Sequence, residues 1–261
     1  MIKILMYKEW AEVFKNRLVL FTVIFLPLLL SALPLVILGT MGDVAAMEGT
    51  LSDMPSAALA MCGANMGTGE CLQVYLLSQF VLMFMLIPLI IPVSIAAYSI
   101  VGEKRAHSLE PLLATPITTW ALILAKGLAA VLPAVAASWL AFLVFAVGGV
   151  ILAVSPAVVK AFLQPMWLLA VIAGGPLLAM LSVSIALMVS SRVNDPRVAE
   201  QLTGVVVVPV LMLLFGQMTG YLVLERSLVV IFLLALVALD AGLLFLTVRV
   251  FDRENILTRW K

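Results

Sequence analysis

The sequence predicts an all-α membrane protein whose chain crosses the bilayer six times. Of its 261 residues, 64% are hydrophobic and only 11% are charged, and the mean hydropathy is +1.23. A soluble domain carries about 25% charged residues, so this chain lacks the charge that a water-facing surface needs. Its apolar runs are continuous rather than alternating, which indicates helices and not barrel strands.

Six stretches reach the roughly 20 apolar residues that a membrane span requires. They lie at about 18–38, 76–101, 127–154, 165–189, 202–222 and 228–248. We expect residues 1–261 to form a single transmembrane domain, with loops at 39–75 and 102–120. The first stretch is longer than the apolar core of a typical signal peptide, so we expect it to be retained.

The distribution of Lys and Arg predicts the orientation of the chain. Thirteen of the fifteen fall before span one, after spans two and four, or in the tail, whereas only Lys160 and Arg226 fall on the other side. Cytoplasmic loops are enriched in Lys and Arg, so both termini are expected in the cytoplasm. Six spans require both termini to share one side, which agrees with this assignment.

The segment before the first span has an amphipathic helical pattern. Ile2, Met6, Trp10, Val13 and Phe14 fall near one face, and the lysines fall mostly elsewhere. This pattern is typical of a helix in the inner membrane interface, and we expect one over residues 1–17. A solvated helix is the alternative, but the apolar side is large for it.

The loop 39–75 is expected to lie outside the cell, because it contains acids and no Lys or Arg. It holds the chain's two cysteines, Cys62 and Cys71. In an oxidising compartment two cysteines at this spacing can close a small disulfide ring. Two free thiols are the alternative, and no metal site is expected there.

Several kinds of chemistry are absent from the sequence. It has no G-x-x-x-x-G-K-[ST] phosphate loop and no HExxH or CxxC motif. Its one histidine, His107, lies in a predicted cytoplasmic loop and is interpreted as a solvated residue. No catalytic residue, no metal ligand and no cofactor bound by this chain are expected, which argues against a membrane enzyme.

Three polar residues inside the spans are candidates for a substrate path: Gln217, Thr219 and Asp240. A carboxylate in mid-membrane costs about 2.5–3.5 kcal/mol on insertion scales, so Asp240 should face the bundle interior or a wet cavity. It could contact a substrate or ion, or be a protonated packing residue, and the sequence leaves both readings open. Few fixed charges in the spans favour a lipophilic or amphipathic cargo over a small hydrophilic ion.

The polar segment VGEKRAHSLEPLLATPITTW after span two predicts a short amphipathic helix at the inner surface. Ser108 can cap it, Leu109, Leu112 and Leu113 share one face, and Pro116 ends it. Such a helix can dock into a groove on a cytoplasmic partner. A plain interfacial connector is the alternative.

The stretch GEKRAHSLEPLLATPITTWALILAK resembles the corresponding loop of ABC type-2 transporter permeases, which reads E-[KR]-x-x-x-[ST]-L-E-x-L-L-[AS]-[TS]-P. The segments KEWAEVFKNRLVL, SSRVNDPRVAEQLTGVVVVP and RVFDRENILTRWK also resemble segments of close prokaryotic members. The resemblance covers nearly the whole chain in order, with the same number of spans.

The resemblance implies the membrane subunit of an ABC exporter in the cell membrane. Members form dimers of six-span permeases, homodimers or heterodimers, each seated on an ABC ATP-binding subunit that binds ATP and Mg²⁺. The loop after span two would carry the motion of the ATPase into the bundle. By similarity, the coupling residues would be Glu103, Lys104, Arg105, Glu110, Leu112, Leu113 and Pro116.

The resemblance does not supply a substrate. The sodium-exporting branch has a much larger outer region than residues 39–75 here, so no sodium substrate is assigned. A membrane assembly or maturation factor built on the same permease fold remains an alternative. In either case the lipid bilayer is a partner, and no nucleic acid is.

Overall fold

The computed structural model describes residues 2–40, 66–105, 118–219 and 226–250. All regular elements in these ranges are helices, and six segments are long and apolar enough to cross a membrane. These segments are Val19–Thr40, Thr68–Arg105, Thr119–Leu152, Pro156–Arg192, Pro196–Met218 and Arg226–Val250. The predicted all-α fold with six membrane-spanning helices is confirmed.

The spans are built from one or several helical elements each. Helix α1 (Ile2–Val13) precedes α2 (Arg17–Thr40), the first span. The remaining elements are α4 (Thr68–Phe84), α5 (Ile87–Arg105), α7 (Thr119–Leu152), α8 (Pro156–Phe162), α9 (Pro165–Leu169), η3 (Ala170–Gly174), α10 (Gly175–Arg192), α11 (Pro196–Thr203), η4 (Gly204–Val207), α12 (Val208–Met218) and α13 (Arg226–Val250).

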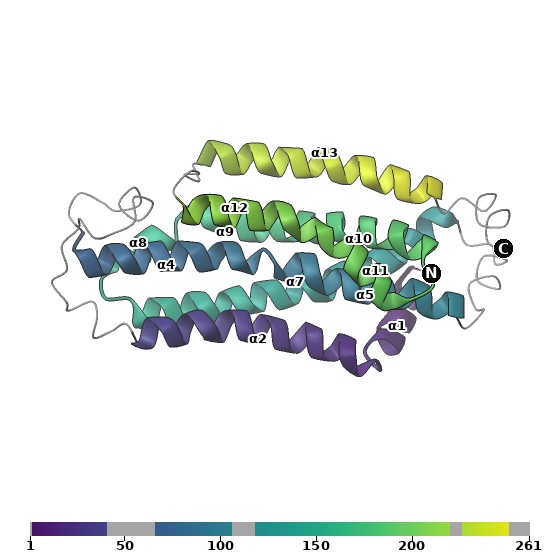
Figure 1. Ribbon diagram of the computed structural model, residues 1–261, viewed down its shortest axis with the longest axis horizontal. Coiled ribbons are helices and arrows are strands. Elements are labelled where there is room, and N and C mark those ends of the chain that lie inside the picture. Colours follow the sequence, from purple (N-terminus) through teal and green to yellow (C-terminus); the bar gives the residue numbers. More distant parts are fainter. Residues whose placement is uncertain (1, 41–65, 106–117, 220–225, 251–261) are drawn as a thin grey trace.

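The second span, α4 with α5, is the central one of an elongated bundle. Its apolar window is 83% buried, whereas the windows of α2 and α13 are each only 17% buried. Figure 1 shows α2 and α13 on opposite sides of the bundle, with α4 and α5 between them. At one end of the bundle, α1, the last turn of α5 and the α10–α11 turn come together. We call this end the charged end.

Aromatic rings fill the core between α4, α7 and α8. The ring of Phe145 lies 4.9 Å from that of Phe84 and 6.0 Å from that of Phe162, measured between centroids. Phe142 meets Phe84 edge-on at 5.9 Å. Such tilted and edge-to-face pairs stabilise a core beyond the area that they bury. They fix α7 against the central span.

Prolines coincide with changes of helical geometry. The central span is interrupted between Phe84 and Ile87, where Met85 and Leu86 donate to carbonyls only three residues back. Pro88 follows directly, and it has no N–H to donate to the carbonyl of Phe84. The tight turn therefore accommodates the proline, while Pro92 lies inside α5 without breaking it.

Two further prolines follow irregular turns in the same way. The wide π-turn η3 ends immediately before α10, whose first turn contains Pro176. The 3₁₀ turn η4 ends immediately before α12, whose first turn contains Pro209. A proline removes one backbone hydrogen bond and crowds the carbonyl four residues back, so the preceding turn widens or tightens to relieve it.

The outward faces of the outer helices are apolar. On α2, Phe21 and Leu28 are 58% and 59% exposed, and on α13, Ile231 and Leu234 are 66% and 65% exposed. A contiguous surface of this kind is not stable against water. These faces are suited to lipid or to another apolar protein surface.

Four spans begin earlier than the hydropathy pattern predicts. The second begins at Thr68 rather than near residue 76, and the fifth begins at Pro196 rather than near residue 202. The third begins at Thr119 rather than near residue 127, with Thr118 accepting a hydrogen bond from Ala121 N as its cap. The fourth begins at Pro156 rather than near residue 165. The third helix extends into polar sequence because Lys126 finds partners inside the protein.

Candidate functional site: a charged junction at one end of the bundle

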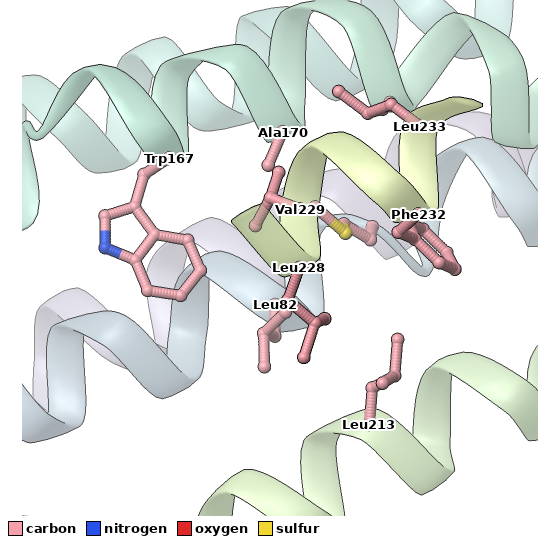
Figure 2. A pocket seen from close by; sticks show the side chains of 10 residues that line it. Leu82, Trp167, Ala170, Leu213, Leu228, Val229, Phe232 and Leu233 are labelled. Atoms are coloured by element: carbon pink, nitrogen blue, oxygen red, sulfur yellow. The ribbon is translucent and has the colours of Figure 1, made fainter. Parts of the chain in front are cut away.

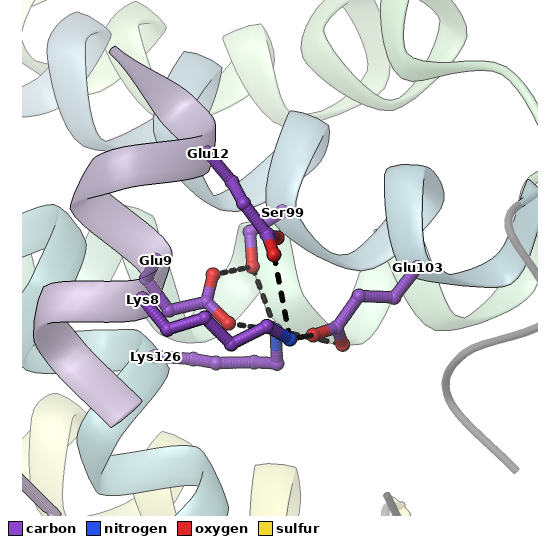
Figure 3. Close-up of polar contacts among 6 residues, drawn as sticks. All are labelled: Lys8, Glu9, Glu12, Ser99, Glu103 and Lys126. Atoms are coloured by element: carbon purple, nitrogen blue, oxygen red, sulfur yellow. Dashed lines mark hydrogen bonds and ion pairs between the residues drawn. The ribbon is translucent and has the colours of Figure 1, made fainter. Parts of the chain in front are cut away.

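Helix α1 packs across the charged end, where α5 and α7 meet, and brings buried charges together (Figure 3). Glu9 from α1, Glu103 from α5 and Lys126 from α7 each have side chains only 4% exposed. Lys8 from α1 is 40% exposed and closes the cluster on its outer side. We call these residues, together with Ser99 of α5, the charged junction.

Lys126 is the centre of the charged junction. Its ammonium donates to Glu9 Oε1 at 2.7 Å and to Ser99 Oγ at 2.8 Å, and it lies 2.8 Å from Glu103 Oε2. The Ser99 hydroxyl donates in turn to Glu9 Oε2. One buried cation thus holds groups from three helices, and a buried cation is stable only when it is paired in this way.

Lys8 links the buried part of the junction to the surface of α1. Its ammonium donates to Glu103 Oε1 at 3.1 Å and lies 3.7 Å from Glu12 Oε1, one helical turn away. Glu103 therefore lies between two ammonium groups, one from α1 and one from α7. Removing either lysine leaves this buried carboxylate with a single counter-charge.

The pKa values of the two α1 residues reflect this pairing. Burial would raise the pKa of Glu9, but the Lys126 ammonium and the hydrogen bonds from Lys126 and Ser99 hold that pKa below its ordinary value of 4.5. Burial would lower the pKa of Lys8, but the Glu103 carboxylate raises it above 10.5. Both groups therefore stay charged near neutral pH.

A second set of contacts ties the end of α5 to the turn between α10 and α11. Lys104 Nζ donates to the carbonyls of Ser191 at 2.7 Å and Val193 at 3.1 Å. Carbonyls at the end of a helix have no partner within that helix, so Lys104 satisfies groups at the end of α10. The last turn of α5 is thereby fixed to the last turn of α10.

Arg105 extends this tie to the start of α11. Its guanidinium donates to the carbonyl of Asn194 at 3.0 Å and to Asp195 Oδ2 at 2.9 Å. Asp195 also caps α11, since Arg197 N donates to its Oδ1 at 2.9 Å. The hydrogen bond from Arg197 N, with that from Arg105, holds the pKa of Asp195 below its ordinary value.

The predicted coupling residues fall in two groups. Lys104 and Arg105 tie α5 to the α10–α11 turn, while Glu103 points into the charged junction rather than toward a surface. The others, like His107, lie outside the described residues: Glu110, Leu112, Leu113 and Pro116. The described chain stops at Arg105 and resumes at Thr118, so both flanks of the predicted coupling loop are helical or capping residues.

The predicted amphipathic α1 is a helix, and its apolar face is turned to the protein. Val13 is 5% exposed, and the Trp10 indole donates to the carbonyl of Ala129 in α7 at 2.8 Å. The α7 backbone thus offers the Trp10 indole a buried acceptor. The outward face carries Ile4 and Tyr7, at 75% and 69% exposed. An interfacial position for α1 remains a prediction.

The three predicted substrate-path residues lie in different environments. Gln217 is fully buried and Asp240 is 4% exposed, and neither side chain has a hydrogen-bond partner in the part of the chain that the structure describes. Thr219 instead donates to Phe215 O in its own helix at 2.9 Å. Leaving a buried amide unpaired costs about 1–3 kcal/mol, so Gln217 and Asp240 require an explanation and Thr219 does not.

Asp240 lies on the buried stripe of α13 that packs on α10. Thr247, two turns further along the same stripe, donates to the carbonyl of Ser184 in α10 at 3.3 Å. The prediction that Asp240 faces the bundle is confirmed by its burial. Among the described residues Asp240 makes no hydrogen bond to Gln217, which lies near the end of α12.

The predicted disulfide has one end in the described chain. Cys71 lies in the first turn of α4, is fully buried and is disulfide-bonded. Cys62, the other of the chain's two cysteines, lies outside the described residues. The pairing of Cys62 with Cys71 therefore stays a prediction.

Sequence reasoning missed Glu9, Ser99 and the role of Lys126. Ser99 and Glu103 are four residues apart and so share one face of α5, which was a usable signal. Lys126 was interpreted as a loop charge at the start of a span. Its partners Glu9 and Glu103 lie 117 and 23 positions away in the sequence, and no local pattern connects them.

These features define a multi-pass helical membrane protein with a polar junction at one end. The chain belongs to the ABC-2 transporter family: the model of the "ABC-2 family transporter protein" matches residues 4–234. The comparison with curated proteins gives no match. The matched range includes the whole charged junction, and the resemblance noted in the sequence is confirmed. The family is the permease component of an ABC transporter, which works with a separate ATP-binding subunit.

Proposed function

We propose that this chain is the permease subunit of an ABC exporter in the cell membrane, with both termini in the cytoplasm. ATP, with Mg²⁺, is hydrolysed by a separate ATP-binding subunit, and two permeases pair in the assembly. The distribution of charge supports this orientation, because thirteen of the fifteen Lys and Arg residues fall on the proposed cytoplasmic side.

The connection of the last turn of α5 to its neighbours is the observation that carries the proposal. Glu103 joins it to α1 and α7, while Lys104 and Arg105 join it to the α10–α11 turn. These three residues lie at the start of the predicted coupling loop, 102–120, and the rest of the loop follows directly. A displacement of that loop is therefore passed to four other helices through direct polar contacts.

The chemistry of these contacts suits the transmission of motion. A buried ion pair resists separation, since leaving one charge buried without its partner costs about 3–5 kcal/mol. The elements on the charged junction therefore move as one body instead of sliding past one another. Membrane segments further along α5, α7 and α10 follow, which is how a cytoplasmic ATPase can open or close a path in the bundle.

Association with an ATP-binding subunit tests the proposal. The chain is solubilised from its native membrane and purified, and co-purifying proteins are identified by mass spectrometry. We expect an ATP-binding-cassette subunit, and we expect Glu110→Lys with Leu112→Asp to lose it, because these changes reverse a charge and bury an acid on the docking face of the loop.

A matched control uses the same two changes on the opposite side of the membrane. Glu48→Lys with Leu51→Asp lies in the loop 39–75 and should leave the association intact. Normal co-purification of the Glu110/Leu112 variant would disprove the role of the loop. Equal losses in both variants would mean that the changes act through folding instead.

A further inference from the structure

An apolar pocket lies between α4, α9, η3, α12 and α13 (Figure 2). Helices α4, α9 and α12 lie in the half of the bundle remote from the charged end (Figure 1). Its walls include Leu82, Met85, Trp167, Leu213, Val229 and Phe232. The pocket is partly open and has a cavity volume of about 30 Å³, which is room for a small apolar group. No charged side chain lines it, so its walls suit a hydrocarbon group.

The two helices α12 and α13 that form part of the pocket wall also reach the outer surface of the bundle. Leu213 and Leu233 line the pocket and are half-buried, and the residues beside them, Met212 and Leu234, are 67% and 65% exposed. Exposed apolar residues on membrane-spanning helices face lipid. A ligand can therefore enter from the bilayer without crossing water.

Two buried glutamines lie one turn away from the pocket, on the same two helices. Gln79 is three residues before Leu82 on α4, and Gln217 is four residues after Leu213 on α12. The hydroxyl of Tyr75, one turn from Gln79, donates to the carbonyl of Met218 at 3.3 Å. This bond places the two glutamines at the same α4–α12 contact.

The side-chain amides of both glutamines make no hydrogen bond among the described residues. Gln79 is 6% exposed and Gln217 is fully buried, and none of their four amide N and O atoms has a hydrogen-bond partner among the described residues. Native proteins pair the great majority of buried polar atoms. Two unpaired primary amides at one helix contact therefore indicate a missing partner that can both donate and accept.

We propose that this pocket, with Gln79 and Gln217, binds a neutral amphiphile. A segment of one alkyl chain of the ligand enters the apolar pocket, and a carbonyl or hydroxyl group of its head hydrogen-bonds to the two amides. A charged head is disfavoured, because no ionisable side chain lines the pocket. That this ligand is the exporter's cargo rests on the proposed function, whereas the binding site itself does not.

Quenching of Trp167 tests the site. The full chain is reconstituted in phosphatidylcholine nanodiscs and titrated with 1-(9,10-dibromostearoyl)glycerol, whose bromines quench a neighbouring indole. We expect a saturable component of quenching that Trp167→Phe removes and that unbrominated 1-oleoylglycerol reverses. Gln79→Leu with Gln217→Leu should raise the half-saturating concentration about tenfold or more, because the head loses its hydrogen bonds.

Matched variants on α13 separate the pocket from the bulk lipid. Leu233→Trp fills the pocket and should abolish the saturable component, whereas Leu234→Trp, on the exposed neighbour, should leave it unchanged. Because the glutamine double variant removes unpaired buried amides, we expect it to fold and to melt at the same temperature as the parent or higher.

Two results would overturn the proposal. Quenching that never saturates and is equal in Leu233→Trp would show simple partition into the bilayer. Unchanged affinity in the glutamine double variant would show that the amides do not contact the head. If an ATP-binding subunit co-purifies but the probe does not bind, this inference fails and the proposed function stands. If the probe binds but no such subunit co-purifies, the site stands and the proposed function fails.

Discussion

Lys126 lies about two helical turns inside a membrane-spanning helix, at a depth where a free cation is costly. The structure shows how this cost is offset, since Glu9 and Glu103 lie within 2.8 Å of its ammonium and Ser99 accepts one of its hydrogens. A pair of this kind adds little net stability relative to a well-packed apolar core. It makes the contact between α1, α5 and α7 specific.

Removing the Lys126 cation while keeping its acidic partners should therefore strongly destabilise the protein. In Lys126→Met, Glu9 loses its buried counter-ion and Glu103 keeps only Lys8, so we expect the free energy of unfolding to fall by about 3–5 kcal/mol. Denaturant unfolding in detergent measures this change. Lys3→Met, which removes an exposed cation from the same end of the bundle, is the control and should have little effect. Equal effects in the two variants would contradict the role assigned to Lys126.

The junction also predicts how stability depends on pH. The folded-state pKa of Glu9 lies below 4.5, so the stabilisation from Glu9 is fully present above 4.5 and is lost as the pH falls through the folded value. We expect the melting temperature to hold above about pH 4.5 and to fall as the pH is lowered further. Glu9→Gln should be less stable at neutral pH and show a smaller decrease in acid. The same decrease in both proteins would place the titrating group elsewhere.

For single residues, the sequence could indicate which polar side chains are candidates for a site, but not which residues they contact. Gln217 and Asp240 stand out in apolar runs, and both are buried. Glu9 lies in a mixed-charge segment where nothing distinguishes it from Glu12, which is 54% exposed. The difference between them arises from the docking of α1 on α7, a contact between residues more than a hundred positions apart.

Helices α2 and α7 approach closely at Gly148. A Cβ atom at this position would overlap the Leu35 side chain of α2. The absence of a side chain lets the two helices meet, as small residues do in membrane helix pairs. This contact fixes the first span to the third.

Adding one methyl group tests that contact. In Gly148→Ala, Leu35 must change rotamer or α2 must move, so we expect a loss of about 1–3 kcal/mol of stability. Gly242→Ala in α13 meets nothing within 4 Å, and it should be neutral or stabilising because alanine favours a helix. Thermal melting of both variants measures the difference, and a neutral Gly148→Ala would mean that α2 is not held at this point.

The sequence predicted the spans better than their internal geometry. Hydropathy located six helices because each apolar run exceeds the membrane thickness. The π-turn η3 and the interruption at Met85–Leu86 follow from prolines whose presence signals a distortion but not its form. The pattern predicts the start of the third span too late, because hydropathy is low at Lys126 although the helix already begins at Thr119.

At the scale of the whole molecule, substitutions at Lys104 and Arg105 can separate two roles of this region: binding the ATP-binding subunit and passing its motion into the bundle. In Lys104→Met with Arg105→Met, residues 106–120 of the predicted coupling loop keep their sequence, but α5 loses its tie to the α10–α11 turn. We expect the ATP-binding subunit to co-purify as before. We expect the stimulation of its ATPase activity by a transported substrate to fall about threefold or more, a typical size for a coupling change.

Co-purification and ATPase stimulation are compared between the parent complex and the complex with the double variant. Loss of co-purification would show that these residues belong to the docking surface. Unchanged stimulation would show that motion reaches the bundle by another route, such as Glu103 and α1. The conservative variant Lys104→Arg with Arg105→Lys keeps both charges and should retain most of the stimulation.

The charged junction also imposes an order on biogenesis. The ribosome makes Glu9 and Glu103 before Lys126, so two acids await their counter-ion while α7 is still being synthesised. When α7 enters the bilayer, its lysine meets carboxylates already held by α1 and α5, which lowers the cost of inserting a charged span. A nascent chain arrested after α5 should therefore stay with insertion chaperones or be degraded, and the emergence of α7 marks the point at which the amino-terminal half becomes self-sufficient.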